Sequence, residues 1–232
     1  PLKDLTSKDL YRIFNLHNIP EISSKRYWVR KFNIKDIDWE SWFQVNTINP
    51  LLPRNIKDYN YKIFFNLVNT ETRLLLMKYS NGMCSTCKSN KENLEHLLFS
   101  CSNVTPIWSY AKKILDKAWP GVTITRLEAL SGSWRDGVSN KNLVLNMIYG
   151  IIRFHIWKIR NRIKYDGETI TTPQSIRILK WELLNHLELL ELDKKIDKNL
   201  IPIFKDLIIR LRNTPIDESF QTRKRRLNHS NN

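Results

Sequence analysis

Apolar residues recur every three or four positions along most of this chain, the spacing that places them on one face of an α-helix. Few stretches alternate between apolar and polar residues with a period of two, so few or no strands are expected. We therefore predict a mainly α-helical protein. The pattern predicts helices over residues 6–17, 58–68, 70–79, 105–118, 141–165, 172–190 and 202–213, with a short helix around Leu127.

Capping residues mark several of these helix boundaries. Thr6 to Asp9 has the capping-box pattern, and Thr70 follows a break at Asn69. Thr105-Pro106 and Thr172-Pro173 each place a capping hydroxyl before a proline suited to the first helical position. We divide the chain into an N-terminal helical and linker segment (1–56), a cysteine-rich region with flanking helices (57–120), a helical bundle (121–213) and a basic tail expected to be disordered (214–232).

Residues 24–45 interleave basic and aromatic side chains, among them Trp28, Trp39 and Trp42. Such a mixture can stack on the bases of a nucleic acid. Trp39 and Trp42 are three positions apart, however, which places both on one helix face. We therefore favour packing in a core for these two side chains.

The charge of the chain is strongly unbalanced. Its 232 residues include 38 Lys and Arg against 23 Asp and Glu, a net charge of +15. A basic balance of this size favours nucleic acid or another anionic surface as the partner. No apolar run reaches 18 residues, so no membrane span is expected. The chain begins with Pro rather than Met, and we expect it to be a piece or a processed product of a longer protein.

The segment 141–165 is the longest helical pattern and carries much of the excess charge. On a helical wheel its apolar face comprises Val144, Ile148, Ile151, Ile152, His155 and Ile159. We expect His155 to be a hydrogen-bonded core histidine. Arg153, Trp157, Arg160 and Lys164 fall on the opposite face, and residues 153–164 hold five basic residues and no acid.

Cations and one aromatic on such a face suit phosphates and an unpaired base. The alternative is a solvated helix whose Trp157 is buried under a neighbouring element. The predicted contacts to nucleic acid are Arg153, Trp157, Lys158, Arg160, Asn161, Arg162 and Lys164, with Lys112 and Lys113 of the preceding helix. In the tail, Arg223, Lys224, Arg225 and Arg226 form a basic run that suits nuclear localisation or further phosphate contacts.

All three cysteines lie within eighteen residues, in the pattern Cys84-x2-Cys87-x8-His96-x4-Cys101. Thiolate sulfur and imidazole nitrogen are the donors that Zn²⁺ most often takes, and four of them fill a tetrahedral site. We predict a structural zinc site with no open position for water, so we expect Glu92 and Glu95 to be solvated rather than general bases. The alternatives are buried cysteines beside a surface histidine, or a disulfide framework.

Two blocks of the sequence resemble a known family. The first block runs from Tyr61 to Trp108. It contains Tyr61 to Phe65, Thr72 and Leu75, then Cys84-x2-Cys87, Glu92-Asn-Leu-Glu-His96-Leu-Leu-Phe99-x-Cys101 and Ile107-Trp108. The second block is Trp157-Lys-Ile-Arg160-Asn161. Together they resemble the C-terminal zinc-binding region of reverse transcriptases from LINE-type (non-long-terminal-repeat) retrotransposons. Asn93 stands where that family usually has Thr. The resemblance covers about residues 5–166 and is most specific through 84–108.

The resemblance implies a module downstream of a polymerase domain. Upstream reverse transcriptase and endonuclease domains would lie in the same polyprotein. The module would bind template RNA, target DNA or both during target-primed reverse transcription, in the nucleus after a cytoplasmic ribonucleoprotein stage. The chain contains no Asp-Asp pair, so we do not expect it to polymerise or to be an enzyme by itself.

Two alternatives to nucleic-acid binding remain open. The zinc region could be a structural module that docks on the polymerase. Some relatives also place a restriction-like endonuclease after a similar cysteine cluster, which needs paired acids and a lysine to hold a divalent metal at phosphate. After Cys101 no such set lies on convincing strands, and Glu191 to Lys194 falls on a helix pattern instead.

Overall fold

The computed structural model describes residues 23–32, 38–134 and 137–217. Its contacts divide the chain into two compact units, Pro1–Ile37 and Asp38–Asn232. The helix predicted over residues 6–17 and the basic run from Arg223 to Arg226 lie outside the described residues. The predicted segments 57–120 and 121–213 both belong to the second unit.

In the first unit, the helix α2 (Ser23–Phe32) carries three of the interleaved aromatic residues. The Trp28 ring stacks on Phe32, four residues further on, with 5.4 Å between centroids. Tyr27 meets the same indole edge-on at 5.6 Å. The aromatic side chains of this helix therefore contact one another, and the stacked pair Trp28 and Phe32 has the four-residue spacing that places side chains on one helix face.

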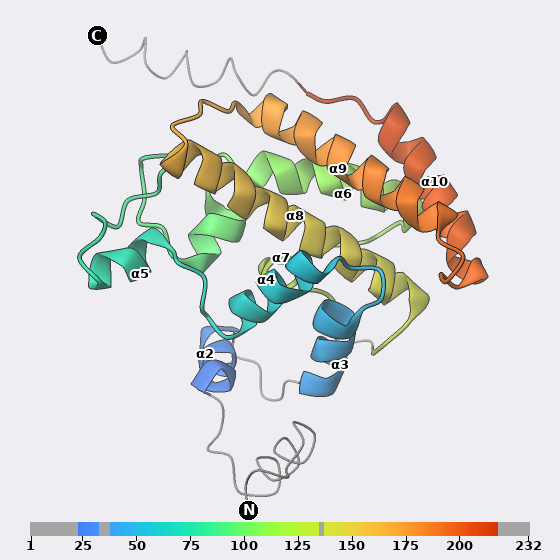
Figure 1. The fold of residues 1–232 in the computed structure, drawn as a ribbon, viewed down its shortest axis with the longest axis horizontal. Helices are drawn as coiled ribbons and strands as arrows, with labels where there is room; N and C mark the ends of the chain where they lie inside the picture. Colours follow the sequence, from blue (N-terminus) through green and yellow to red (C-terminus); the bar gives the residue numbers. More distant parts are fainter. Residues whose placement is uncertain (1–22, 33–37, 135–136, 218–232) are drawn as a thin grey trace, which may run out of the picture. The chain divides into compact units, whose positions relative to one another are not determined.

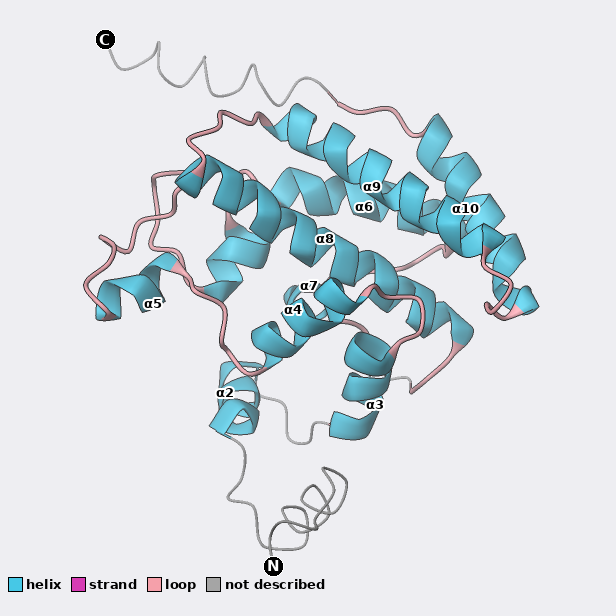
Figure 2. Cartoon of the chain, viewed as in Figure 1, coloured by secondary structure: helices cyan, strands magenta, loops and turns pink. Residues whose placement is uncertain are grey.

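The second unit is built from helices and the loops that join them, of which the one after α5 is long (Figures 1 and 2). Among the described residues, the one β-type pairing is an isolated antiparallel bridge between Met83 and Lys91. The prediction of a mainly α-helical protein is confirmed. In chain order the elements are α3 (Trp39–Phe43), a π-helical turn η2 (Gln44–Ile48), α4 (Arg54–Phe64), α5 (Glu71–Leu76), a π-helical turn η3 (His96–Ser100), α6 (Thr105–Ala118), α7 (Arg126–Ser131), α8 (Asn140–Tyr165), α9 (Thr172–Leu192), a 3₁₀ turn η4 (Lys198–Leu200) and α10 (Ile201–Asn213).

Helices α5, α6 and α9 begin close to the predicted capping residues, but of the three predicted caps Thr70 alone has that role. Thr105 is the first residue of α6, and its hydroxyl donates to the carbonyl oxygen of Cys101. Thr70 caps α5 by accepting the N–H of Arg73. The helix α9 begins at Thr172, as predicted, and the capping side chain is that of the preceding residue, Thr171, which forms a capping box with Gln174. Local side-chain hydrogen bonds of this kind depend on a few neighbouring residues, which is why sequence pattern locates them.

The helix α8 is the centre of the second unit. It crosses the middle of the unit in Figure 1 and packs against η2, α4, α7, η3 and α9. On the side of α9, α6 and α10, the core is a layer of fully buried apolar side chains. Leu115, Leu179, Leu187, Phe204 and Leu207 are each 0 % exposed.

Because α8 has neighbours on more than one side, part of its polar face is buried too. Arg153 is 1 % exposed, and its Nη2 donates to the side-chain oxygens of Asn46 and Asn60 at 3.0 Å each. Burial lowers the pKa of Arg153 to about 10, so the side chain stays charged at neutral pH. The prediction that Arg153 faces solvent and contacts nucleic acid is wrong, because this guanidinium joins α8 to η2 and α4.

The two asparagines extend this network to other elements. The Asn46 amide donates to the carbonyl oxygen of Ser131 in α7, and the Asn60 amide donates to the carbonyl oxygen of Asn46. The prediction that Trp42 packs in a core is confirmed, since Trp42 is 2 % exposed and its ring lies 4.0 Å from that of Phe64. No side chain is described for Trp39.

Within the described residues, no helix is both long enough and apolar enough to cross a membrane.

We predict that Asn60→Ala lowers the free energy of unfolding by about 1.5–3 kcal/mol, the usual value of a hydrogen bond to a charged group. The buried guanidinium of Arg153 then loses one of its two acceptors. The matched control is Asn55→Ala on the exposed side of the same helix, which we expect to change stability by less than about 0.5 kcal/mol. Urea denaturation followed by circular dichroism measures both, and equal losses for the two variants would contradict the role assigned to Arg153.

Candidate metal centre

The four predicted metal ligands come together in the fold. The ligand atoms of Cys84, Cys87, His96 and Cys101 all lie within 4.8 Å of one another. The sulfur atoms of Cys84 and Cys101 are 4.0 Å apart, and the sulfur of Cys87 is 3.4 Å from His96 Nε2. All three cysteines are free, and 4.0 Å is about twice the length of a disulfide bond. These four side chains can hold one metal ion.

A tight turn supplies the first two ligands. The Met83–Lys91 bridge brings the two ends of the loop together. Inside it, the N–H of Lys88 donates to the carbonyl oxygen of Cys84 at 3.0 Å. Lys88 has a φ of 59°, which lets the chain reverse directly after Cys87. Cys84 and Cys87 therefore approach the site from one short turn.

The other two ligands flank the π-helical turn η3. His96 opens the turn, and the side-chain oxygen of Asn93 accepts its N–H at 2.8 Å. Cys101 follows the turn and donates its own N–H to the carbonyl oxygen of His96. The Trp108 indole of α6 donates to the carbonyl oxygen of Leu98 at 2.7 Å, in a buried position. This bond anchors η3, and with it both ligands, to the helix that follows.

The sulfur atoms of Cys84 and Cys101 share a hydrogen bond. This bond lowers the pKa of Cys101 to about 7 and, together with burial, raises the pKa of Cys84 to about 12. The hydroxyl of Thr86 lies 3.1 Å from the sulfur of Cys84 and 3.4 Å from that of Cys101. Because metal ligands must be deprotonated, a metal ion that binds here displaces the protons of these thiols.

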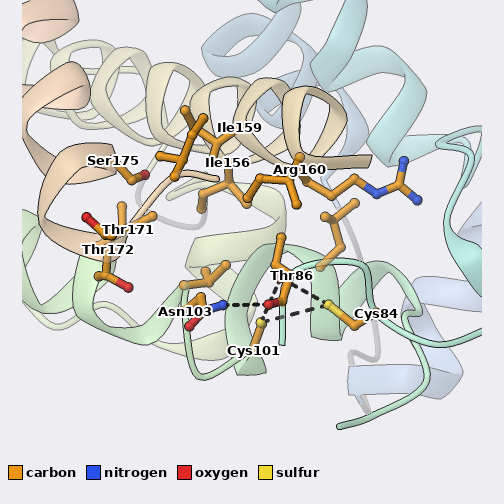
Figure 3. Close-up of a pocket in the computed structure, with 15 residues that line it drawn as sticks. Cys84, Thr86, Cys101, Asn103, Ile156, Ile159, Arg160, Thr171, Thr172 and Ser175 are labelled. Atoms are coloured by element: carbon orange, nitrogen blue, oxygen red, sulfur yellow. Dashed lines mark hydrogen bonds between the residues drawn. The ribbon is translucent and has the colours of Figure 1, made fainter. Parts of the chain in front are cut away.

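Figure 3 shows a cavity between the metal ligands and α8. Cys84 and Cys101 lie on one side of it, and Ile156 and Ile159 lie on the other. Its volume is about 30 Å³. A cavity of that size has room for a water molecule or two and none for a substrate. The arrangement therefore suits a structural site rather than a catalytic one.

A buried group of charged side chains ties the metal loop to α8. Arg160 is 2 % exposed and reaches Glu92, whose side chain is 0 % exposed, with its Nε at 3.3 Å and its Nη2 at 2.6 Å. The same Nη2 donates to Glu71 at the start of α5 at 2.7 Å. Lys164 pairs with Glu71 at 2.6 Å. Two acids and two bases from α5, the metal loop and α8 thus form a nearly neutral cluster.

This cluster corrects two predictions. Glu92 is not solvated, and Arg160 does not face solvent to contact nucleic acid. The physical reason is shared: the basic face of α8 passes over two acids, and charges this deeply buried are tolerated only when paired and hydrogen-bonded. Burial opposes ionisation of Glu71, but hydrogen bonds from Lys164 and Ser80 and the charge of Arg160 outweigh it and hold the pKa of Glu71 below its ordinary value.

The other predicted nucleic-acid contacts do not form one cationic stripe. Lys158 pairs with Glu182, Arg162 with Glu168 and Lys112 with Asp116, whereas Lys113 is exposed. Trp157 is half-buried against Tyr59 and Phe154. Asn161 accepts a hydrogen bond from Arg160. For these side chains, contact with nucleic acid stays a prediction.

The predicted core role of His155 is confirmed. The ring is 0 % exposed, with Nδ1 3.0 Å from Glu182 Oε2 and Nε2 3.0 Å from the hydroxyl of Ser175. This order of groups resembles a catalytic triad. Ser175 is only 4 % exposed, however, and it lines the cavity of about 30 Å³, which no substrate can enter. The three side chains therefore serve to join α8 to α9.

We predict that Arg160→Met lowers the free energy of unfolding by about 3–5 kcal/mol, because it leaves two buried carboxylates without their shared partner. Arg162→Ala removes the same charge two residues further on, where Arg162 and Glu168 are 42 % and 37 % exposed. We expect that change to leave the free energy of unfolding nearly unchanged, because solvent screens an exposed ion pair. Urea denaturation of the metal-loaded protein gives both values. The assignment fails if Arg160→Met is as stable as Arg162→Ala.

No known protein family, curated protein or solved structure matches this chain.

Proposed function

We propose that this chain is a polynucleotide-binding module whose fold is held by a structural zinc ion and which has no catalytic activity of its own. The observation that supports it best is the charge pattern around the metal loop and α6. Between Lys78 and Lys117 all three acids are engaged: Glu92 pairs with Arg160, Glu95 with Arg126 and Asp116 with Lys112. Five exposed lysines of the same segment form no ion pair with the described residues, and these are Lys78, Lys88, Lys91, Lys113 and Lys117.

Uncompensated lysines at a surface favour a polyanion. Each lysine that neutralises a phosphate releases a condensed counterion, which is a large part of the driving force for binding nucleic acid. The three acids of this segment are already paired with basic side chains of the protein, so they do not oppose the attraction between these lysines and phosphates. The excess of basic residues over the whole chain acts in the same direction.

The donor set and its spacing suit zinc. Three thiolates and one imidazole are among the commonest ligands of structural Zn²⁺. Ordinary Zn–S and Zn–N bonds at tetrahedral angles separate two sulfurs by about 3.8 Å, and a sulfur from a nitrogen by about 3.6 Å. The observed 4.0 Å and 3.4 Å lie close to these values. Cys84, Cys87, His96 and Cys101 would fill all four positions, so the ion would supply folding free energy rather than an activated water.

The two blocks that carry the family resemblance meet in space. Glu92 belongs to the first block and Arg160 to the second, and they are joined by the buried salt bridge. Asn93 accepts the N–H of His96, a capping role that the Thr usual in the family could also fill. These observations support the proposal of a retrotransposon reverse-transcriptase module that binds element RNA, target DNA or both in the nucleus, beside polymerase and endonuclease domains of the same polyprotein.

A second candidate is a module that docks on another protein domain. Exposed apolar side chains gather on α5 and the turn after it. Leu76 is 85 % exposed, Tyr79 80 % and Met77 49 %. Contiguous apolar residues at a surface often mark an interaction site.

We predict that the purified protein carries one zinc ion per chain. Cys87→Ser should lose most of that zinc and most of the cooperative thermal transition, because metal binding in such sites is folding free energy. The matched control, Ser100→Ala beside Cys101, should keep both. Atomic emission for metal content and circular dichroism for melting decide the matter. A Cys87→Ser protein that melts like the wild type would contradict the structural role of the ion.

We predict polynucleotide binding that weakens steeply with salt and depends on the lysines near the metal loop. Replacing Lys88, Lys91 and Lys113 by Ala should reduce the slope of log affinity against log salt by about 2–3, since each phosphate contact contributes about 0.9. The control replaces Lys194, Lys195 and Lys198, exposed lysines beyond α9, and so removes the same charge. Fluorescence anisotropy over a salt series measures both. Equal slopes for the two triple variants would show that binding follows net charge and not this surface.

A further inference from the structure

A second feature of the second unit is an open groove between α4 and α8. Its volume is about 590 Å³, within the usual range for ligand sites. Tyr59 and Lys62 of α4 line it, as do Phe154, Trp157, Asn161 and Tyr165 of α8. The groove differs from the cavity beside the metal ligands in both size and lining, since four of these six side chains are aromatic.

Three of the aromatic rings hold one another in place. The centroids of Tyr59 and Trp157 are 5.3 Å apart, those of Phe154 and Trp157 are 5.5 Å apart, and those of Tyr59 and Phe154 are 5.6 Å apart. Rings packed on each other in this way form a rigid wall. Tyr165 is 62 % exposed, and Lys164 Nζ lies 5.0 Å from its ring centroid. A flat apolar ligand can therefore meet an open ring and a fixed aromatic wall in one groove.

Asn161 adds a hydrogen-bond donor of defined orientation. Its side-chain oxygen accepts from Arg160 Nη1 at 3.0 Å. A guanidinium only donates, so this bond fixes which end of the amide carries the oxygen. The NH₂ end of Asn161 has no partner among the described residues and is left to donate to an acceptor on a ligand.

A basic side chain at the groove points to an anionic ligand. Lys62 is exposed on α4 and forms no ion pair with the described residues. It supplies a cation at the groove, where the exposed Asp58 of the same helix is also among the lining residues.

We propose that this groove receives an unpaired base from a single-stranded RNA or DNA segment. The base stacks on the aromatic side chains, the Asn161 NH₂ donates to its edge, and Lys62 pairs with the adjoining phosphate. Stacking on a protein ring needs an open base face, which a base inside a duplex does not offer. The inference rests on the proposed polynucleotide binding, and it names the place on the protein where a single strand binds.

The test measures affinity for a 12-nucleotide single strand and for the duplex of the same sequence, in RNA and DNA versions, by fluorescence anisotropy. Tyr165→Ala removes the most exposed ring. We expect it to weaken single-strand binding about tenfold, in the range of one lost base–aromatic stack, with duplex binding unchanged. The control is Trp181→Ala on α9, where an indole 66 % exposed lies outside the groove. That change should leave both affinities as they are.

A second pair of variants tests the amide. Asn161→Asp keeps the oxygen that faces Arg160 but replaces the NH₂ donor, so single-strand affinity should fall by about the same factor. Asn140→Asp makes the same change of charge at the exposed first residue of α8 and should have little effect. A 2-aminopurine placed in the strand gives an independent readout, since its fluorescence should be quenched by the wild type and not by Tyr165→Ala.

The outcomes separate the two proposals. If the wild type binds single strands and both groove variants match their controls, the groove inference is overturned and the lysine surface stands. If the wild type binds duplex but no single strand, the groove inference is likewise overturned and binding through the exposed lysines stands. If the wild type binds neither single strands nor duplex at any salt concentration at which it stays folded, the proposal of polynucleotide binding is wrong. The groove inference, which rests on it, is then wrong as well. The RNA and DNA arms show which sugar the groove prefers.

Discussion

Arg160 is the side chain on which the arrangement of the second unit most depends. It holds Glu92 through Nε and Nη2 and reaches Glu71 with the same Nη2, and all three side chains are almost fully buried. None of them can be removed from water at low cost unless the others are present. The start of α5, the metal loop and α8, the longest helix, are therefore held together by one guanidinium. The four candidate metal ligands lie within eighteen residues of one another in the chain, and Arg160 connects their loop to the bundle.

The same cluster changes how the charge of the chain should be interpreted. Arg153 and Arg160 add to the net charge, but neither reaches the surface, and Lys164 is largely taken up by Glu71. The basic helix therefore contributes less to the outward field than its composition indicates. Among the described residues, exposed lysines of the metal loop and α6 form no ion pair, and every acid of that segment already has a basic partner. In the proposed function, the groove lined by Trp157 would add base stacking to electrostatic attraction.

Helix positions and metal ligands were predictable because each depends on residues close together in the chain. The capping of α5 by Thr70 is a local hydrogen-bond pattern, and Pro106 suits the first turn of α6 because of its own backbone geometry. The cysteine and histidine spacing is likewise local, since one short turn and one π-helical turn carry all four ligands. Such signals survive without knowledge of the tertiary fold. The buried ion pairs had no local signal, because Glu92 and Arg160 are 68 positions apart.

The amino-acid order alone therefore specified a helical chain, the four ligands and the excess of positive charge. It did not specify which charges would be buried. A helical wheel assumes one buried face, whereas α8 has neighbours on several sides, so Arg153 and Arg160 found partners on α4, η2, α5 and the metal loop. Pairing of groups far apart in the chain is settled when the helices pack, because only then do desolvation and Coulomb attraction act on the same atoms.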